Sequence, residues 1–517
     1  MSASRSTDRK RGVHLADVLE AAVRRDPAAP AVYEGHRLYS YSELSALVAR
    51  LAAALGPLRR LCPEGGSPYP PRVAILAGNS AYAVAAFFAT AAAGLIAVPL
   101  TPDLDENRLA AFLAHSEASA VLVPQTLLSR VLAVRDQTPS VRLLVTDAPW
   151  DSLPPGPSTG PASAGRSTAD LAAIVYTSGS TGRPKGVMLT HEALVSNARA
   201  VVKYLDLRAS DRSLLVLPLG YIMGLSVLLT HVVAGASLVL QRRFLFPSVV
   251  IDALAEYRCT GFYGVPATYA LLLRSPSVLQ ANLSSLRYLA QAGGALAPEL
   301  QARLCEAFPG ARLYVMYGAT EAGPRISYHL LKRPNDARSS VGKPIAGVTV
   351  RVVDDDGLDV PCGDTGEILV KSPGLMLGYW RDEEATRRVL RDGWYRTGDL
   401  GLLSEAGELT ITGRTREFIK VRGHRIGLGA IESVLAEIPG IVDVAVIGVA
   451  DELLGEAPVA YFVGAPCDVA VRAARLLPGH MRPVAYHRVP SLPRTASGKV
   501  DRRGLLELHL GASSESM

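Results

Sequence analysis

Short apolar segments alternate with helix-forming segments through the first 320 residues, and this alternation limits the fold more than any other feature. Six apolar runs have the length of buried strands, at 73–78, 120–125, 142–147, 172–178, 213–219 and 312–318. Leu44, Leu47, Val48, Leu51 and Leu55 repeat at the spacing of one helix face. Continuous apolar strands separated by helices predict parallel sheets that are covered by helices on both faces.

The pattern changes after residue 340. The segments 348–357 and 366–372 predict antiparallel strands, and the "DDDG" at 354–357 indicates a turn between strands rather than a metal site. The final segment, 417–517, has apolar strands of its own and is long enough for a small domain. The sequence thus predicts an α/β protein. Its large N-terminal domain, 1–413, has parallel-rich sheets covered by helices and a β-rich subdomain, and a small α+β domain follows.

Composition narrows the class of protein. The chain has 517 residues, of which 49% are hydrophobic and 20% are charged, which is typical of a soluble globular protein. The net charge of +6 comes without a dense basic stripe, so we expect a solvated arginine-rich surface and no nucleic-acid partner. The uncharged stretch 73–102 contains Gly94 and Pro99, so we expect a buried helix followed by a strand and no membrane span.

Two further features of the sequence indicate the cellular compartment of the protein. The N-terminal residues carry charge but no apolar segment follows them, so no secretory signal is visible. The five cysteines are scattered without the spacing of a zinc site. We therefore expect a cytoplasmic protein whose cysteines serve packing.

The segment "TSGSTGRPKG", from Thr177 to Gly186, follows the apolar run at 172–178. A glycine-rich turn after a strand presents backbone N–H groups, which bind phosphate oxygens. Lys185 adds a compact positive charge in a chain with far more arginine than lysine. The P-loop pattern GxxxxGK[ST] does not match, and a polar surface loop is the alternative. The phosphate-site candidates are Thr177, Ser178, Gly179, Ser180, Thr181, Gly182 and Lys185.

Four other segments have the composition of a nucleotide site. "YGATEAGP" (317–324) places an aromatic ring, a hydroxyl and a carboxylate after a strand, where Tyr317 suits a base and Glu321 suits Mg²⁺. "WYRTGDLG" (394–401) carries Asp399, an acceptor for a ribose diol. The segment 413–427 is strongly cationic, and "LPRTASGKVDRR" places Lys499 near the C-terminus. Taken singly, each segment also has a structural explanation: a hairpin turn, a solvated charged face or a tail.

Together, and in this order, the five segments resemble the core motifs of the adenylate-forming superfamily. That superfamily comprises acyl-CoA and aryl-CoA ligases, adenylation domains of nonribosomal peptide synthetases, and luciferases. The resemblance extends over nearly the whole chain. It implies an enzyme that activates a carboxylic acid with ATP and Mg²⁺ and then transfers the acyl group to a thiol.

The resemblance also implies roles for individual residues. The loop 177–186 with Lys185 would hold the β- and γ-phosphates. Thr320 would contact the adenylate phosphate, Glu321 would bind Mg²⁺, and Lys499 would bridge the carboxylate and the α-phosphate. The adenosine would contact Gly294, Ala295, Tyr317, Gly318, Asp399 and Arg414. The substrate pocket would be lined by Tyr221, Met223, Gly224, Tyr263, Gly293 and Ala319.

The chemistry accounts for such a set. A carboxylate attacks the α-phosphate and pyrophosphate leaves, so cations must offset the charge of two anions. In the superfamily the C-terminal domain then rotates about a hinge, which here would be 414–416 with Arg416. Rotation would withdraw Lys499 and bring the loop with Lys420, Gly423 and Arg425 toward the adenylate. The acceptor would be the phosphopantetheine thiol of CoA or of an acyl or peptidyl carrier protein.

The segment 217–227 departs from the superfamily pattern. Gly220 and Tyr221 stand where many CoA ligases have an aromatic residue and a histidine, and where amino-acid-activating domains have an aspartate. No acidic residue lies between Arg212 and Asp252 to pair with a substrate ammonium group, so an α-amino acid is disfavoured. We expect Gly220 to leave space, and Tyr221, Met223 and Tyr263 favour an aromatic or medium-length acid. An amine as the second nucleophile and a non-catalytic nucleotide-binding relative are the alternatives.

Overall fold

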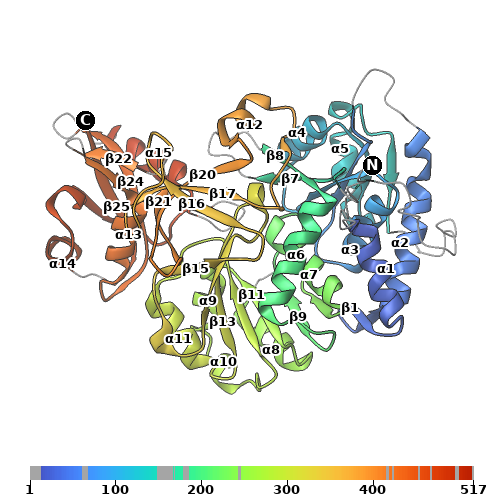
Figure 1. Cartoon of the computed structure of the whole chain (residues 1–517), viewed down its shortest axis with the longest axis horizontal. Helices are drawn as coiled ribbons and strands as arrows, with labels where there is room; N and C mark the ends of the chain where they lie inside the picture. Colours follow the sequence, from blue (N-terminus) through green and yellow to red (C-terminus); the bar gives the residue numbers. More distant parts are fainter. Residues whose placement is uncertain are drawn as a thin grey trace, which may run out of the picture.

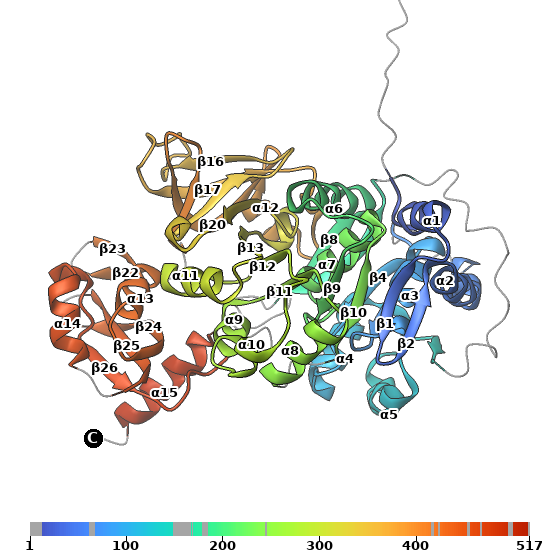
Figure 2. The same ribbon diagram turned by 90° about the horizontal axis from the view of Figure 1, so that it is seen from below.

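The structure is a computed structural model, and it contains three β-sheets (Figure 1). It describes residues 13–60, 68–147, 167, 169–177, 185–242, 246–414, 418–421, 424–451, 455–465, 468–494 and 500–514. Two of the sheets form the larger part of the molecule. The third lies at one end with helices α13 to α15 (Figure 2).

The seven-stranded sheet has the order β18-β8-β7-β4-β3-β5-β6. Its middle strands are parallel, whereas β8 and β18 are antiparallel to their neighbours. The strands are β3 (Arg72–Leu76), β4 (Ile96–Leu100), β5 (Ala118–Leu122), β6 (Leu143–Val145), β7 (Leu171–Thr177), β8 (Lys185–Thr190) and β18 (Gly378–Tyr379).

The second sheet has 14 strands, and its parallel part is the order β13-β12-β11-β9-β10-β1. Each of the six apolar runs predicted as strands in the first 320 residues overlaps a strand of one of these two sheets. The parallel strands and the adjoining β2 are β1 (Pro30–Glu34), β2 (Arg37–Ser40), β9 (Arg212–Leu215), β10 (Ser237–Leu240), β11 (Gly261–Gly264), β12 (Tyr288–Gln291) and β13 (Arg312–Tyr317).

Helices fill the space between the two sheets. Alternate residues of β3 face opposite sides: Val73 and Ile75 join a core with α3 and α7, and Ala74 and Leu76 join a second core under α4. The predicted helix face is buried on α2, which begins at a Ser40 capping box. The helices between the sheets are α1 (Leu15–Arg25), α2 (Tyr41–Leu55), α3 (Ala81–Ala92), α6 (His191–Leu205) and α7 (Ile222–Ala234), and α4 (Glu106–Ser116) and α5 (Leu128–Ala133) cover the other face of the seven-stranded sheet.

The uncharged stretch 73–102 forms β3, the buried helix α3 and β4, as predicted. Among the described residues, no helix has both the length and the apolar character needed to cross a membrane. The remaining helices of the large part are α8 (Pro247–Glu256), α9 (Pro266–Leu272), α10 (Ser277–Gln280), α11 (Pro298–Ala307) and α12 (Glu383–Val389).

The other half of the large sheet is antiparallel. The predicted hairpin is β16 paired with β17, and Gly357 (φ +83°) lies in the turn that contains the three aspartates. No group of three or more potential metal-binding side chains occurs in the described part of the chain. These strands are β14 (Ser327–Leu331), β15 (Ser340–Pro344), β16 (Thr349–Val353), β17 (Gly366–Lys371), β19 (Leu390–Arg391), β20 (Trp394–Leu403) and β21 (Leu409–Arg414).

The third sheet has the order β23-β22-β25-β24, with β26 beside β25, and its own apolar core under α13 and α14. Helix α13 also contacts β21 of the large sheet. The mixed α/β fold with a smaller C-terminal part is therefore confirmed. Its elements are β22 (Phe418–Val421), β23 (His424–Gly427), α13 (Leu428–Ala436), β24 (Ile441–Asp451), β25 (Gly455–Gly464), α14 (Val469–Leu476), β26 (Ala485–Arg488) and α15 (Arg502–Ser514).

Candidate active site

Two predicted segments follow the carboxyl ends of neighbouring parallel strands, where α/β sheets bind ligands. Residues 292–296 follow β12, and Gly293 there has φ +90°. Residues 318–324 follow β13. This second segment is a closed loop, because the Ile326 N–H donates to the Tyr317 carbonyl at 2.8 Å. A Cβ on Gly318 would lie 2.2 Å from the Pro324 carbonyl oxygen, so only glycine fits there. The loop therefore holds Thr320 and Glu321 in a fixed position.

Three of the residues predicted to contact adenosine meet at one carboxylate. Asp399, which is 4% exposed, accepts a hydrogen bond from the Tyr317 hydroxyl at 2.5 Å. Its other oxygen lies 2.7 Å from Nε of Arg414, which is opposite Asp399 on the neighbouring strand. Burial raises the pKa of Tyr317 well above its usual value, and the Asp399 charge adds to the shift. Tyr317 therefore stays a protonated donor.

A second cluster joins the lysine of the phosphate loop to the predicted metal ligand. The Lys185 ammonium lies 4.5 Å from the centre of the Tyr379 ring. The Tyr379 hydroxyl donates to Oε1 of Glu321 at 2.9 Å. Strand β18 places Tyr379 there by pairing with β8, where Tyr379 is opposite Val187. Tyr379 thus connects two motifs that are far apart in the sequence.

Sequence reasoning missed Tyr379. Its strand has only two residues, which is too short for a periodic pattern. The "GYW" at 378–380 was the one available signal. Trp380 strengthens the attachment, because its backbone N–H donates to the Gly186 carbonyl at 2.7 Å.

Tyr395 lies close to both clusters, because it belongs to one apolar core with Ala322 of the Glu321 loop, and Tyr317 packs against that core. It is buried on β20. Burial raises its pKa well above the usual value, and the negative charges of Glu321 and Asp399 raise it further. Adenosine-side and phosphate-side residues therefore share one site.

The oxygen atoms at Glu321 and Thr320 fit the Mg²⁺ ion that accompanies ATP. Glu321 and Thr320 offer oxygen atoms, which this ion prefers, and the described residues hold no cluster of three potential metal-binding side chains. Mg²⁺ usually takes one or two protein carboxylates and completes its shell with phosphate oxygens and water. When bound, it would offset the charge of the phosphates.

Thr177 and Lys185 are opposite each other at the end of the β7–β8 pair. The predicted loop residues Ser178, Gly179, Ser180, Thr181 and Gly182 lie outside the described residues. The same holds for Arg416, Gly423 and Lys499, and for the side chains of Lys420 and Arg425. Their roles stay predictions.

The predicted lining of the substrate pocket, here called the substrate wall, begins at the N-terminus of α7. Tyr221 is the N-cap residue, and Met223 follows in the first turn. Burial raises the pKa of Tyr221, and a hydrogen bond with Thr101 opposes that shift. The structure thus places the phenol beside the end of β4. Gly224 is close to backbone as well, because a Cβ there would lie 2.2 Å from the Pro218 carbonyl oxygen.

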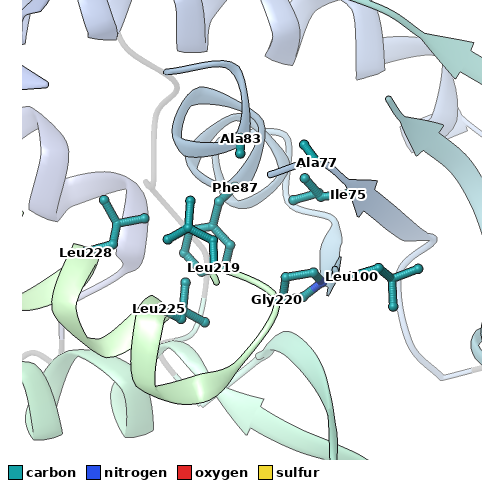
Figure 3. Close-up of a pocket in the computed structure, with 10 residues that line it drawn as sticks. Ile75, Ala77, Ala83, Phe87, Leu100, Leu219, Gly220, Leu225 and Leu228 are labelled. Carbon is teal, nitrogen blue, oxygen red and sulfur yellow. The ribbon is translucent and has the colours of Figure 1, made fainter. Parts of the chain in front are cut away.

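The expectation that Gly220 leaves space for the substrate is wrong. A Cβ on Gly220 would lie 2.8 Å from the backbone carbon of Leu100 and the nitrogen of Thr101. Glycine is present because two backbones approach closely. The void beside it holds only about 10 Å³ and has an apolar lining that includes Phe87, Leu219 and Leu225 (Figure 3). That void is far too small for an acid substrate.

Tyr263 lies at the end of β11 and is 1% exposed. The edge of its ring contacts His231 of α7, with 5.9 Å between ring centres. Burial lowers the pKa of His231 to about 4, so this ring is neutral at pH 7. Its Nδ1 donates to the Val227 carbonyl at 2.8 Å, and Nε2 accepts from the Tyr288 hydroxyl at 3.2 Å.

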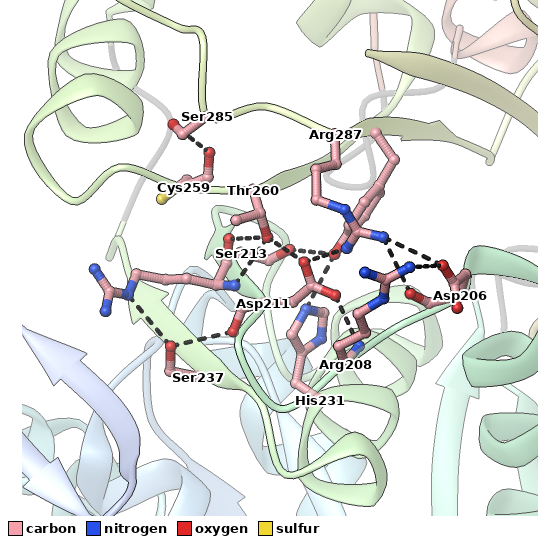
Figure 4. Close-up of polar contacts among 12 residues, drawn as sticks. Asp206, Arg208, Asp211, Ser213, His231, Ser237, Cys259, Thr260, Ser285 and Arg287 are labelled. Carbon is pink, nitrogen blue, oxygen red and sulfur yellow. Dashed lines mark hydrogen bonds and ion pairs between the residues drawn. The ribbon is translucent and has the colours of Figure 1, made fainter. Parts of the chain in front are cut away.

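A paired polar network continues from His231 toward the amino ends of the strands (Figure 4). Asp211, which is 1% exposed, accepts from Thr260 at 2.7 Å and from Arg287 at 2.5 Å. Each buried group here has a partner of opposite charge or hydrogen-bonding role, which favours a structural function.

Comparison with known proteins identifies the chain. The AMP-binding enzyme family model matches residues 19–380, and the model of the AMP-binding enzyme C-terminal domain matches residues 430–499. The chain belongs to the AMP-binding enzyme family. It is an ATP-dependent, AMP-forming ligase that activates a carboxylic acid.

Individual relatives cover almost the full chain. Indoleacetate–CoA ligase of Aromatoleum aromaticum is 35% identical over 96% of this chain and 98% of its own length. The anthranilate CoA ligase AuaEII, solved with anthranoyl-AMP, matches with a TM-score of 0.87 at 27% identity, over 97% of this chain and 98% of its own. The amide bond synthetase McbA from Marinactinospora thermotolerans matches with a TM-score of 0.84 at 28% identity, over 95% and 99%.

Proposed function

We propose that this ligase converts an aromatic or medium-length carboxylic acid into its CoA thioester through an acyl-adenylate. The observation that carries the proposal is the contact of Lys185 and Glu321 with the same side chain, Tyr379. A phosphate-binding cation and a carboxylate that suits Mg²⁺ thereby lie at one place, beside the adenosine-side cluster. The aromatic acids named in the indoleacetate and anthranilate ligases support the choice of acid.

In the adenylation step, the substrate carboxylate attacks the α-phosphate of ATP, and pyrophosphate leaves. Lys185 would offset the charge of the departing phosphates, and Thr320 would donate a hydrogen bond to the phosphate that stays. Glu321 would hold the Mg²⁺ that accompanies ATP, and Lys499 would bring the two anions together. Asp399 would exchange its contact with Tyr317 or Arg414 for the ribose hydroxyls.

In the second step, the thiol of phosphopantetheine replaces AMP. The charged segment with Lys420, Gly423 and Arg425 would contact this acceptor after a rotation about Arg416. CoA is the acceptor named in the ligases above, and a carrier protein presents the same phosphopantetheine group.

A panel of acids tests the proposal through ATP-dependent release of pyrophosphate. Indoleacetate, anthranilate, benzoate, hexanoate and several α-amino acids are each assayed alone, with CoA and with a phosphopantetheinylated carrier protein. We expect release with an aromatic or medium-length acid, and loss of free thiol only when CoA is present. An α-amino acid as the best substrate, or no release with any acid, would contradict the proposal.

The similarity to McbA favours a second candidate, an adenylating enzyme that forms an amide. The same panel separates the two, because each active acid is also offered primary amines without CoA. An amide product formed faster than the thioester would favour this alternative.

A further inference from the structure

Arg325 is a buried cation without a counter-ion among the described residues. It is 1% exposed and is among the largest fully buried side chains. Its Nη1 donates to the Pro324 carbonyl at 2.7 Å, and its Nε contacts Sδ of Met316 at 3.2 Å. Its Nη2 has no hydrogen-bond partner among the described residues. A carbonyl oxygen and a thioether satisfy part of the guanidinium but do not neutralise its charge.

The other buried arginine among the described residues is paired with a carboxylate, and so is the partly exposed Arg287. Arg72, buried on β3, has Glu117 at 2.9 Å. Arg287 has the fully buried Asp211 at 2.5 Å. A buried charge without a partner costs several kcal/mol of folding free energy. Arg325 therefore differs from Arg72 and Arg287, and folding stability does not explain why a cation is buried there.

A second unpartnered polar group lies near Arg325. The Tyr263 hydroxyl is buried and has no hydrogen-bond partner within the described part of the chain. Burial raises the pKa of Tyr263 to about 12, and the positive charge of Arg325 opposes that shift, as do the side chains of Tyr288 and Thr230. At neutral pH both are hydrogen-bond donors.

The sheet brings these groups to one face. Tyr263, Ala290 and Tyr314 are aligned across β11, β12 and β13, and Met316 lies two residues beyond Tyr314 on the same face. Ala290, the smallest of them, lies between the two tyrosines. Helix α6 covers this face, because Asn197 of α6 donates to the Arg325 carbonyl at 2.9 Å.

The position of Arg325 relative to Thr320 and Glu321 indicates how a bound acid would be oriented. Arg325 immediately follows the closed loop that holds Thr320 and Glu321, and it points into the buried layer. Gly293, Gly294 and Gly318, at the carboxyl ends of the same strands, are exposed. A carboxylate reacting at the exposed edge would leave the other end of the acid near Arg325.

We infer that Arg325 and the Tyr263 hydroxyl bind a second anionic oxygen group of the substrate, a carboxylate or a sulfonate, at the end remote from the carboxylate that is adenylated. This inference rests on the proposed function and narrows its substrate class to acids with two anionic groups. Two donors, one of them charged, match the paired oxygens of such a group. The substrate would supply the negative charge that pairs with the Arg325 guanidinium.

Matched pairs of acids test the inference by kcat/KM for pyrophosphate release. Benzoate is compared with the benzenedicarboxylates and the sulfobenzoates, and butyrate is compared with succinate and sulfopropionate. We expect the best dianion to exceed its matched monoanion by about 10²-fold or more, because a site built for a polar group rejects the analogue without it. A preference for monoanions throughout the panel would overturn the inference.

Arg325→Met keeps the side-chain volume and removes the charge. It is expected to lower kcat/KM for the dianion by about 10²-fold or more, while the monoanion changes less than about threefold and the KM for ATP stays constant. Tyr263→Phe, which removes one hydroxyl, is expected to act in the same direction with a smaller effect. Tyr269→Phe is the matched control, because the hydroxyl of Tyr269 is bonded to the Phe262 and Ala290 carbonyls. An unchanged ratio in Arg325→Met would overturn the inference.

Binding without ATP separates this inference from the proposed function. If no acid releases pyrophosphate, the proposed function fails, and thermal unfolding with benzenedicarboxylates or sulfobenzoates decides the role of Arg325. A rise in unfolding temperature for the wild type that is lost in Arg325→Met supports the site, and no rise overturns it. If Arg325→Met does not fold, Tyr263→Phe and the wild-type preference decide the question.

Discussion

The nucleotide side and the acyl side of the site satisfy their polar groups in opposite ways. On the nucleotide side, the charged groups contact one another: Asp399 holds Tyr317 and Arg414, and Tyr379 connects Lys185 to Glu321. On the acyl side, the buried Arg325 and Tyr263 keep donor atoms without partners among the described residues.

The difference follows from charge pairing. Asp399 is buried too, but its charge is paired with Arg414, so it can exchange its contact with Tyr317 for ligand oxygens without being left unpaired. A deeply buried cation without such a partner has no compensation. The comparison therefore predicts broad tolerance in the contacts to ATP and strict selection among acids. The following predictions test that contrast, from the largest effect to the smallest.

The largest effect is expected at Lys499. Lys499→Ala removes the cation that we assign to the meeting of carboxylate and α-phosphate, so adenylate formation should fall by about 10²- to 10³-fold. Thioester formation from a supplied acyl-adenylate should persist, because the rotated state does not use this lysine. Both half-reactions are followed separately, by pyrophosphate release and by loss of free thiol. Equal losses in the two would refute the assignment.

Tyr221 tests whether acid selection depends on the start of α7. Tyr221→Ala should change the order of preference among acids, with individual kcat/KM values shifting by about 10-fold or more, and should leave the KM for ATP nearly unchanged. Both parameters are measured on the same acid panel. A preference profile identical to that of the wild type would remove Tyr221 from the substrate wall.

Glu321→Gln tests the metal assignment. The amide keeps the shape and one acceptor oxygen but loses the charge, so the Mg²⁺ concentration for half-maximal activity should rise by about 10-fold. Titration of Mg²⁺ at saturating ATP measures it. An unchanged midpoint would place the ligand elsewhere.

Tyr379 tests whether one side chain supports both the lysine and the carboxylate. Tyr379→Phe removes only the hydrogen bond to Glu321, and a loss of about 5- to 10-fold in kcat/KM for ATP is expected. Tyr379→Leu also removes the ring beneath Lys185, so a further loss of about 2- to 5-fold is expected. Tyr257→Phe is the control and should have no effect. The Tyr257 hydroxyl also donates one hydrogen bond, but to the Gly35 carbonyl and not to a residue assigned to the site. Equal activity of the Phe and Leu variants would show that the ring contributes nothing.

The smallest effect is expected at Gly220. Gly220→Ala places a methyl group against the backbone of Leu100 and Thr101, so the free energy of unfolding should fall by about 1 to 3 kcal/mol. Chemical denaturation of the wild type and the variant measures the difference. The order of preference among acids should stay unchanged, since Gly220 adjoins backbone and an apolar void. A reordered profile would support the original expectation that Gly220 leaves space for the acid.

Much of this protein was determined by local sequence. The strands at 73–78 and 312–318 and the buried face of α2 follow from hydrophobic periodicity, which depends on neighbours a few residues apart. The phosphate loop and the "YGATEAGP" segment identified the ligase chemistry for the same reason, since backbone donors and nearby side chains form a motif within one turn.

Tertiary structure decided what depends on distant contacts. Tyr379 reaches Glu321 only because a two-residue strand pairs with β8. Gly220 is required by the backbone of β4, which precedes it by more than a hundred residues. In the sequence, Arg325 is one arginine among 46. Its importance comes from burial against Met316 and α6 without a carboxylate from the described part of the chain, and burial is a property of the packed layers that no local pattern of residues encodes.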